Sequence, residues 1–305
     1  MNFELTILGS SSAIPTSERY PTAQVLNVLE RFFLIDCGEG TQIQLRRLKI
    51  NFAKIGHICI SHLHGDHYYG LIGFISTRNL LGINNDLHIY AHSGLKNLLQ
   101  PQIDYLKADL QFKIIFHPLN FRKPELIFSD NRAEVLSFPL KHSVPVCGFL
   151  FREKRQLPHM RKEKIAEFQI PLRQIQAIKE GAGFTTESGA VIPHSELTTP
   201  AAPPRSYAFC TDTAYFEPAA EIIHGVDLLY HEATFLDEMA GWAAQTYHST
   251  ARQAAEMARN AQAKKLLIGH FSTRYKELQP FLDEARQIFP DTELASDGAR
   301  FRISR

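Results

Sequence analysis

The stretch that decides the fold is Ser61-His-Leu-His-Gly-Asp-His-Tyr-Tyr-Gly70. Within it, three imidazoles and one carboxylate come from His62, His64, Asp66 and His67. Ligands of these types hold zinc and similar divalent ions. On an extended chain, positions i and i+2 project to the same side, so His62 and His64 can bind one ion together. A turn at Gly65 would then direct Asp66 and His67 toward a second ion, which predicts a hydrolase that activates water.

Three further ligands are expected at the ends of apolar, strand-like runs. His142 ends Val135–His142, Asp212 ends Tyr207–Asp212, and His270 ends Leu266–His270. Strand ends can present side chains to a shared cleft, although each residue taken alone could also be a cap or a satisfied core group. Together they complete a set for two ions about 3.5–4 Å apart. We expect one ion on His62, His64 and His142, a second on Asp66, His67 and His270, and Asp212 as the bridge.

Composition limits the other possibilities. A chain of 305 residues with 44% hydrophobic residues can bury one large core or two small ones. Because 33 Lys+Arg oppose 32 Asp+Glu, any binding of a polyanion must come from a local patch. The four cysteines (Cys37, Cys59, Cys147, Cys210) are scattered in apolar runs, which predicts reduced core thiols. With no leader peptide and no apolar run of about 20 residues, we expect a soluble, cytoplasmic protein.

The hydrophobic pattern predicts many short strands first and alternating strands and helices later. Strands are expected at Phe3–Leu8, Phe32–Asp36, His57–Ser61, Leu87–Ala91, Lys113–Phe116, Val135–Pro139, Phe149–Arg152, Ser206–Thr211, Asp227–Tyr230 and Lys265–Ile268. Helices are expected near Thr41–Leu48, Leu71–Leu81 and Thr250–Ala263. Thr250 and Gln253 form a capping-box pattern at the start of the third helix. This order favours two packed sheets with helices outside.

Residues 157–200 differ in character from the rest of the single domain that we expect over residues 1–305. They are polar, rich in proline and glycine, and lack a sustained apolar period. Over Phe151–Arg205, nine basic residues face six acidic ones. We interpret residues 157–200 as an inserted arm. A solvated segment of mixed charge is the alternative interpretation, since the surplus is only three.

The motifs resemble the metallo-β-lactamase superfamily and, within it, the short form of the ribonuclease Z family. The segments that carry the resemblance are Leu8-Gly-Ser-Ser-Ser-Ala-Ile-Pro15, Asp36-Cys-Gly-Glu-Gly-Thr-Gln42, Ser61–His67, Thr211-Asp-Thr213, His231-Glu-Ala-Thr-Phe235, His248-Ser-Thr250 and Gly269-His-Phe-Ser-Thr-Arg-Tyr275. The resemblance implies an α/β fold, the αβ/βα four-layer sandwich with an inserted flexible arm. It also implies that Asp36 orders the turns of the site without binding metal.

The same resemblance implies roles for individual residues. His248 would protonate the leaving oxygen and Glu232 would orient it, while Asp66 would accept a proton from the attacking water. Arg274 would contact phosphate, with the Ser10–Ser12 turn, Ser10 foremost, and Arg19 as weaker candidates for that contact. The arm would bind the tRNA through basic residues, namely Arg161, Lys162, Lys164, Arg173 and Lys179. An ordinary ion pair or cap remains the alternative for Glu232 and His248.

The expected function is that of a zinc-dependent endoribonuclease that removes the 3′ trailer from precursor tRNA and acts as a homodimer. Zinc could be replaced by manganese or iron, since the ligand types accept all three. Two alternatives are a small-molecule phosphodiesterase or arylsulfatase of the same superfamily, and a non-catalytic RNA-binding protein. The basic arm disfavours the first, and the full ligand set disfavours the second.

Overall fold

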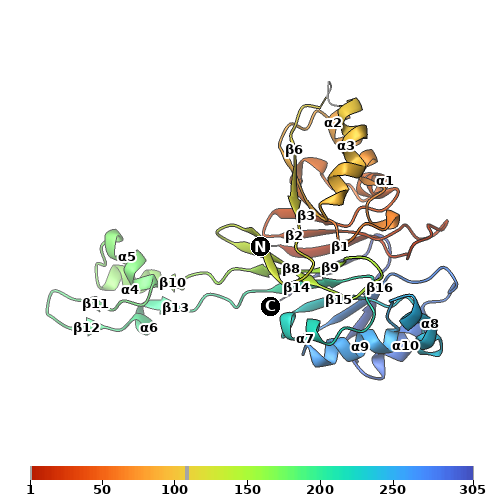
Figure 1. Ribbon diagram of the computed structural model, residues 1–305. Coiled ribbons are helices and arrows are strands. Elements are labelled where there is room, and N and C mark those ends of the chain that lie inside the picture. The colour runs from red at the N-terminus through yellow and green to blue at the C-terminus, as the bar shows by residue number, and fades with distance from the viewer. Residues whose placement is uncertain (1, 107–109, 305) are drawn as a thin grey trace. The chain divides into compact units, whose positions relative to one another are not determined.

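Two seven-stranded sheets form the framework of the computed structural model, which describes residues 2–106 and 110–304 (Figure 1). The chain divides into two compact units. Unit 1 comprises Met1–Arg152 and Arg205–Ser304, and unit 2 is Glu153–Pro204. Within the described residues, no helix has the length and hydrophobicity needed to span a bilayer.

The first sheet of unit 1 has the order β18-β1-β2-β3-β4-β5-β6. Its strands are β1 (Phe3–Gly9), β2 (Ala23–Val28), β3 (Arg31–Ile35), β4 (Ile55–Cys59), β5 (Leu87–Ala91), β6 (Ile114–Pro118) and β18 (Arg300–Arg302). Strands β1, β2 and β3 pair antiparallel, whereas β3, β4, β5 and β6 pair in parallel. The carboxyl ends of the parallel strands therefore meet at one edge.

The second sheet has the order β17-β16-β15-β14-β9-β8-β7. Its strands are β7 (Glu125–Ser129), β8 (Ala133–Pro139), β9 (Cys147–Glu153), β14 (Ser206–Cys210), β15 (Leu228–Glu232), β16 (Leu266–Gly269) and β17 (Thr292–Leu294). Strands β14 to β17 run parallel to one another, and β9 pairs antiparallel to β14. This sheet, too, gathers the carboxyl ends of its parallel strands at one edge.

Three hydrophobic clusters define four layers. Between the sheets, Phe33 and Tyr90 belong to the same cluster as Phe149 and Tyr230. The first sheet packs against α1 (Thr41–Arg47), α2 (Leu71–Leu80) and α3 (Gly94–Leu106). The second packs against α7 (Pro218–Ile222), α9 (Ala251–Asn260) and α10 (Gln279–Arg286). The expected helix–sheet–sheet–helix sandwich is confirmed. Short elements η1 (Phe52–Lys54), η2 (Gly65–His67), η3 (Asp237–Met239) and α8 (Ala240–Gln245) connect these layers.

Helix α9 begins as expected. The Thr250 hydroxyl accepts a hydrogen bond from the Gln253 backbone N–H, and the Gln253 side chain accepts one from Thr250 N–H. This capping box satisfies two donors that a helix start would otherwise leave unpaired. Four residues on one face, Ala254, Met257, Ala258 and Ala261, are buried. All four cysteines are also buried and form no disulfide, which agrees with the expected core thiols.

Several elements have no counterpart among the expected ones. Strand β2 was not expected because Gln24 and Asn27 interrupt its apolar residues, yet all six of its residues are buried. Helix α3 carries Pro101 in its interior, where proline usually ends a helix. Strand β7 is short and largely exposed, so it shows little apolar alternation.

Unit 2 corrects the expectation of a segment without an apolar pattern. It contains α4 (Lys162–Glu167), α5 (Leu172–Lys179) and α6 (His194–Leu197), with two short strand pairs, β10 (His159–Met160) with β13 (Thr198–Thr199) and β11 (Phe184–Thr185) with β12 (Val191–Ile192). Its core is formed by Ile170, Ile178, Phe184 and Leu197. These residues are too far apart in sequence to show a period, and the fold brings them together.

Candidate active site

All seven expected ligands lie just beyond strand ends in unit 1. His62, His64, Asp66 and His67 follow β4, and η2 turns the chain at Gly65 as the sequence predicts. His142 follows β8, Asp212 follows β14 and His270 follows β16. The fold gathers their side chains into two adjoining clusters, and a third, overlapping group places His248 beside Asp212 and His270.

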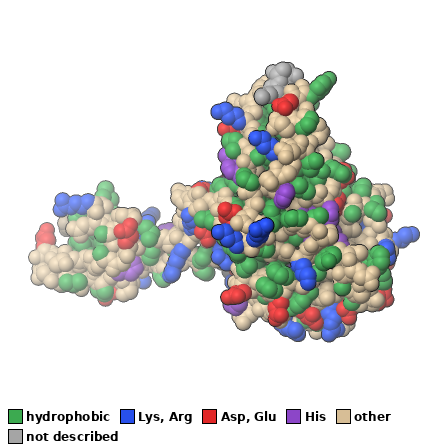
Figure 2. Space-filling model, in the orientation of Figure 1, with side chains coloured by type: hydrophobic (Ala, Val, Ile, Leu, Met, Phe, Trp, Pro, Cys, Tyr) green, Lys and Arg blue, Asp and Glu red, His purple; other side chains and the backbone are tan. Residues whose placement is uncertain are grey.

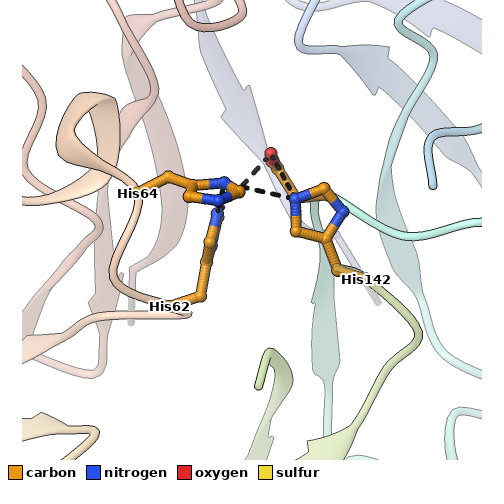
Figure 3. A group of neighbouring side chains, drawn as sticks. His62, His64 and His142 are labelled. Carbon is orange, nitrogen blue, oxygen red and sulfur yellow. Dashed lines mark hydrogen bonds and ion pairs between the residues drawn. The ribbon is translucent and has the colours of Figure 1, made fainter. Parts of the chain in front are cut away.

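The first cluster contains His62, His64, His142 and Asp212. His64 Nδ1 lies 3.1 Å from His62 Nε2 and 3.2 Å from His142 Nε2. Figure 3 shows the three histidine rings converging on one point. Asp212 Oδ2 completes the group, at 3.6 Å from His62 Nε2 and 4.0 Å from His142 Nε2.

The second cluster contains Asp66, His67 and His270. Here the other oxygen of Asp212 takes part, because Oδ1 lies 3.2 Å from His67 Nε2 and 3.1 Å from His270 Nε2. Asp66 Oδ2 lies 3.2 Å from His67 Nε2 and 3.9 Å from His270 Nε2. Asp212 thus faces both clusters, one oxygen to each, as a bridging carboxylate would.

The donor atoms have the chemistry and spacing that metal ions require. Among the described residues, His67 Nε2 and His270 Nε2 are buried without a hydrogen-bond partner, although carboxylate oxygens lie close by. Ligands placed about 2.0–2.2 Å from a tetrahedral ion lie roughly 3.3–3.6 Å from one another. The separations of 3.1–4.0 Å across the two clusters fit that value. The site therefore suits metal binding.

Four of the histidines are held by their Nδ1 atoms, which leaves Nε2 for the site. The partners are Ser61 Oγ for His62, Asp36 Oδ2 for His67, Tyr247 O for His142 and Thr234 Oγ1 for His270, at 3.0, 2.7, 3.0 and 2.9 Å. Such outer contacts fix the ring orientation of a metal-binding histidine. The protein itself therefore supplies contacts that orient these four rings.

Asp36 holds the ligand loop, the segment Ser61–His67 that follows β4 and carries four of the ligands. Its carboxylate accepts hydrogen bonds from Ser61 N–H at 2.8 Å, from Ser61 Oγ at 2.9 Å and from His67 Nδ1 at 2.7 Å. Asp36 lies in neither cluster. These contacts agree with the ordering role that the resemblance implies.

Backbone strain concentrates around the clusters. Four residues of the site have left-handed φ values: Asp36 at 54°, Asp212 at 46°, Tyr247 at 57° and His270 at 62°. This conformation is uncommon outside glycine, although asparagine, aspartate and histidine adopt it more often than other residues, and it is frequent at functional sites. At Tyr247 the conformation accompanies the backbone carbonyl contact to His142.

Glu232, which is buried, and His248, which is partly buried, form a pair beside the clusters. His248 Nδ1 donates to Glu232 Oε1 at 2.9 Å. Thr213 N–H, at 2.6 Å, and Thr234 Oγ1, at 2.6 Å, also donate to the Glu232 carboxylate. The ring of His248 stacks on that of His270 with centroids 5.5 Å apart. The pairing that resemblance alone implied is present in the fold.

Electrostatics within the site favour ionised carboxylates. Burial would raise the pKa of Asp212, but His270, His67 and His62 hold it well below its usual range. Burial opposes a charge on His248 as well, yet the Glu232 carboxylate raises the pKa of His248 to about 9. This direction favours the protonated form of His248, which is the form that a general acid needs.

A cleft of about 560 Å³ opens over the clusters. Arg274 lines it, with its guanidinium carbon 5.8 Å from the centre of the Trp242 ring. Of the expected Ser10–Ser12 turn, Ser12 lines the cleft, whereas Ser10 is fully buried and its hydroxyl donates to Asp297 at 2.7 Å, so the structure does not support a phosphate contact by the Ser10 side chain. Arg19 donates to the carbonyl of Tyr275 at 3.1 Å and thereby fixes the segment that carries Arg274.

The basic residues expected to bind tRNA in unit 2 differ in their surroundings. Arg161 Nε donates to the carbonyl of Thr198 at 3.1 Å, which ties two parts of unit 2 together. Lys164 pairs with Glu167 at 2.7 Å. Lys162 is exposed. Arg161 and Lys179 line a cavity of about 530 Å³ in this unit.

Comparison with known proteins identifies the family. A family model described as "Anti-Pycsar protein Apyc1" matches residues 3–143, and one described as "Beta-lactamase superfamily domain" matches residues 196–271. A relative from Phocaeicola vulgatus, named Ribonuclease Z, is 46% identical over 99% of this chain and 97% of its own length. The chain belongs to the ribonuclease Z family.

Other ribonuclease Z comparisons agree. A Ribonuclease Z from Bacteroides thetaiotaomicron is 47% identical over 99% of this chain and 96% of its own. The crystal structure of human tRNase Z, short form, matches with a TM-score of 0.72 at 26% identity. It covers 99% of this chain and 100% of the human one. The chain therefore has the metallo-β-lactamase fold that its motifs indicate.

Sequence reasoning missed the residues that orient the histidines. Thr234 lies in the quoted segment His231–Phe235 but was given no role, although its hydroxyl contacts both Glu232 and His270. Tyr247 acts on His142 through its backbone carbonyl, and a contact of that kind has no signature in residue type. The position of Tyr247 next to His248 was the only available signal.

Proposed function

We propose that this protein removes the 3′ trailer from precursor tRNA by hydrolysing one phosphodiester bond and leaving a 3′ hydroxyl on the tRNA. One observation carries the proposal: the identity of 46% to a Ribonuclease Z extends over 99% of the chain. The paired His248 and Glu232 beside two clusters of metal-type donors support it, since phosphodiester hydrolysis needs a proton donor near the activated water.

Two zinc ions are the proposed cofactors. His62, His64 and His142 would hold one ion, Asp66, His67 and His270 would hold the other, and Asp212 would bridge them. Bound divalent ions would lower the pKa of a water molecule and neutralise the charge that develops on the phosphate. The mixed nitrogen and oxygen donor set also accepts manganese or iron.

The chain's own residues supply the proton transfers. His248 keeps Nδ1 on Glu232 and can hold a proton at Nε2 for the departing 3′ oxygen. Glu232 cannot turn away, because backbone and hydroxyl donors from Thr213 and Thr234 fix its carboxylate. Asp66 presents an ionised carboxylate in the cleft, where it can accept the proton of the attacking water. Buried hydrogen bonds thus hold the side chains that are proposed to transfer protons.

Substrate contacts are proposed at two places. Arg274 lines the cleft and can form charge-assisted hydrogen bonds to a phosphate at the acceptor end. Residues 157–200 are proposed as an arm that binds tRNA away from the cleavage site, with Arg161, Lys162 and Lys164 among its basic residues. We further propose a homodimer and a cytoplasmic location. The four buried thiols without disulfides support the latter.

Incubation with a precursor tRNA that carries a 3′ trailer tests the proposal. In the presence of zinc or manganese we expect one cut near the base that precedes the trailer, with a 3′ hydroxyl on the tRNA. Chelation of the metal should abolish the reaction and re-addition should restore it. Absence of cleavage, together with hydrolysis of a small phosphodiester, would instead favour the small-molecule enzyme.

A further inference from the structure

A groove lies between helix α3 and strand β6 on the first sheet. Its cavity has a volume of about 600 Å³. Strand β6 is the last strand of that sheet, so one of its edges is unpaired within the described residues. The five residues of β6 extend about 16 Å at about 3.3 Å per residue. That length accommodates a few nucleotides or a short extended peptide.

The chemistry of the lining favours an anion with aromatic groups. Phe116 is half-buried in the wall, and the exposed residues Lys96 and Lys113 line the groove. Among the described residues neither lysine has an ion-pair partner, and no aspartate or glutamate lines the cavity. Asp86 lies near one end, where it accepts a hydrogen bond from the Lys113 backbone N–H at 3.2 Å. Figure 2 shows basic and hydrophobic side chains on the surface around α3 and β6.

The groove begins beside the ligand loop. Cys59 and Tyr90 are partners in the parallel β4–β5 pair, and Ile60 N–H donates to Tyr90 O at 2.9 Å, so the segments that follow the two strands, with His62 and His92, leave the sheet at the same edge. His92 lines the groove. A Cβ atom added to Gly94 would lie 3.3 Å from Leu63 Cδ1, so the start of α3 packs directly against the loop. Leu63 stands between His62 and His64, which places the groove one strand from the proposed reaction centre.

We propose that this groove binds the single-stranded 3′ trailer, the part of the RNA that follows the bond to be cut. The inference rests on the proposed function and extends it to the trailer that the reaction releases. Cationic grooves with aromatic side chains bind single strands without sequence preference, through phosphate contacts and base stacking. Lys96 and Lys113 would contact trailer phosphates, and Phe116 would stack on a base. A trailer held here could be of any sequence.

The test compares two precursors of the same tRNA, one with a trailer of a single nucleotide and one with a trailer of about ten. The double variant Lys96→Glu/Lys113→Glu is compared with wild type and with Lys49→Glu, a charge reversal at an exposed lysine that does not line the groove. We expect the double variant to raise KM for the long trailer about fivefold or more, and to leave KM for the short trailer within about twofold. Lys49→Glu should change neither.

Crosslinking is a second measurement, and it locates the trailer on the protein without relying on kinetic constants. A long-trailer precursor carrying 4-thiouridine in the trailer should crosslink to residues 92–118 of the wild type. Equal effects of the double variant on both precursors, or crosslinks only to other parts of the chain, would overturn the inference. If wild type cuts neither precursor, the proposed function itself fails. If it cuts both and the double variant behaves as wild type, only the groove assignment fails.

Discussion

Asp212 shows how single residues organise this site. Its two oxygens face different clusters, and its own left-handed backbone positions the carboxylate at the end of β14. The histidines around it are each fixed through the ring nitrogen that points away from the site. Chemistry at the residue scale therefore depends on the neighbours that hold each ring.

His248→Ala should lower kcat for precursor tRNA by about 10²- to 10⁴-fold, because a positioned proton donor contributes that much. Metal content, measured by elemental analysis, should stay at the wild-type level, since His248 is proposed as the acid and not as a metal ligand. Glu232→Gln should reduce kcat as well, because the neutral amide no longer supports the imidazolium. The exposed His224 offers a control, and His224→Ala should leave kcat unchanged. Loss of metal in His248→Ala would contradict the assignment.

His57 predicts how stability depends on pH. Burial, with the charges of His88 and His117, lowers the pKa of His57 to about 4. In the unfolded chain the pKa is about 6.5, so the unfolded state binds more protons between those values. The contribution of His57 to the free energy of unfolding is therefore fully present above about pH 6.5 and is lost as the pH falls toward 4. Between pH 6.5 and pH 4, the free energy of unfolding of the wild type should fall by up to about 2 kcal/mol more than that of His57→Gln.

Chemical denaturation of both proteins at several pH values, at constant ionic strength, measures this difference. A constant difference in unfolding free energy between wild type and His57→Gln would contradict the prediction. The ring of His57 lies 5.1 Å from that of His88 and 4.8 Å from that of Phe128, centre to centre. The substitution therefore also removes packing, which shifts the difference equally at every pH.

At the scale of elements, two loops are joined so closely that only glycine fits. Cys37 N–H donates to His67 O at 2.8 Å, and Gly70 N–H donates to Cys37 O at 2.9 Å. A Cβ atom on Gly70 would lie 2.0 Å from the carbonyl oxygen of Gly38. This contact holds the ligand loop against the end of β3.

Gly70→Ala should therefore destabilise the protein by about 1–3 kcal/mol, as overpacking does, and should also weaken metal binding because the loop must move. Gly241→Ala is the matched control, since an added Cβ there has no neighbour within 4 Å among the described residues. Thermal unfolding and metal titration of the two variants provide the comparison. Equal behaviour of both variants would show that the loop tolerates the shift.

The same elements explain what could be predicted from the sequence. Ligands follow strand ends, and strand ends meet at sheet edges, so apolar runs that end in His or Asp predict the clusters. The Glu232–His248 contact joins two loops, and spacing alone cannot predict it. Helix α3 could not be predicted, because proline usually ends a helix and Pro101 lies inside this one. The core of unit 2 could not be predicted either, because its residues, such as Ile170 and Leu197, are distant in sequence. Local patterns specify elements, whereas contacts between loops require the folded chain.

At the scale of the whole molecule, the division into two units allows the proposed tRNA binding and the proposed chemistry to be tested separately. Unit 1 contains both clusters and the cleft, while unit 2 has a hydrophobic core of its own. Replacement of residues 157–200 by a short Gly-Ser linker should reduce kcat/KM for precursor tRNA by at least about 100-fold, since the proposed phosphate contacts are lost. Hydrolysis of a small chromogenic phosphodiester should persist. Survival of both activities would mean that residues 157–200 are not a tRNA-binding arm.

The left-handed residues of the site have a consequence for protein engineering. Replacing Asp36, Asp212, Tyr247 or His270 by glycine would relieve an unfavourable backbone conformation, and a procedure that optimises thermal stability alone would favour such changes. Three of the four would remove a side chain of the site, and the fourth, Tyr247, would loosen the carbonyl that holds His142. At these positions, a substitution that raises thermal stability is therefore expected to lower turnover. Stabilised versions of this enzyme should be sought elsewhere in the chain.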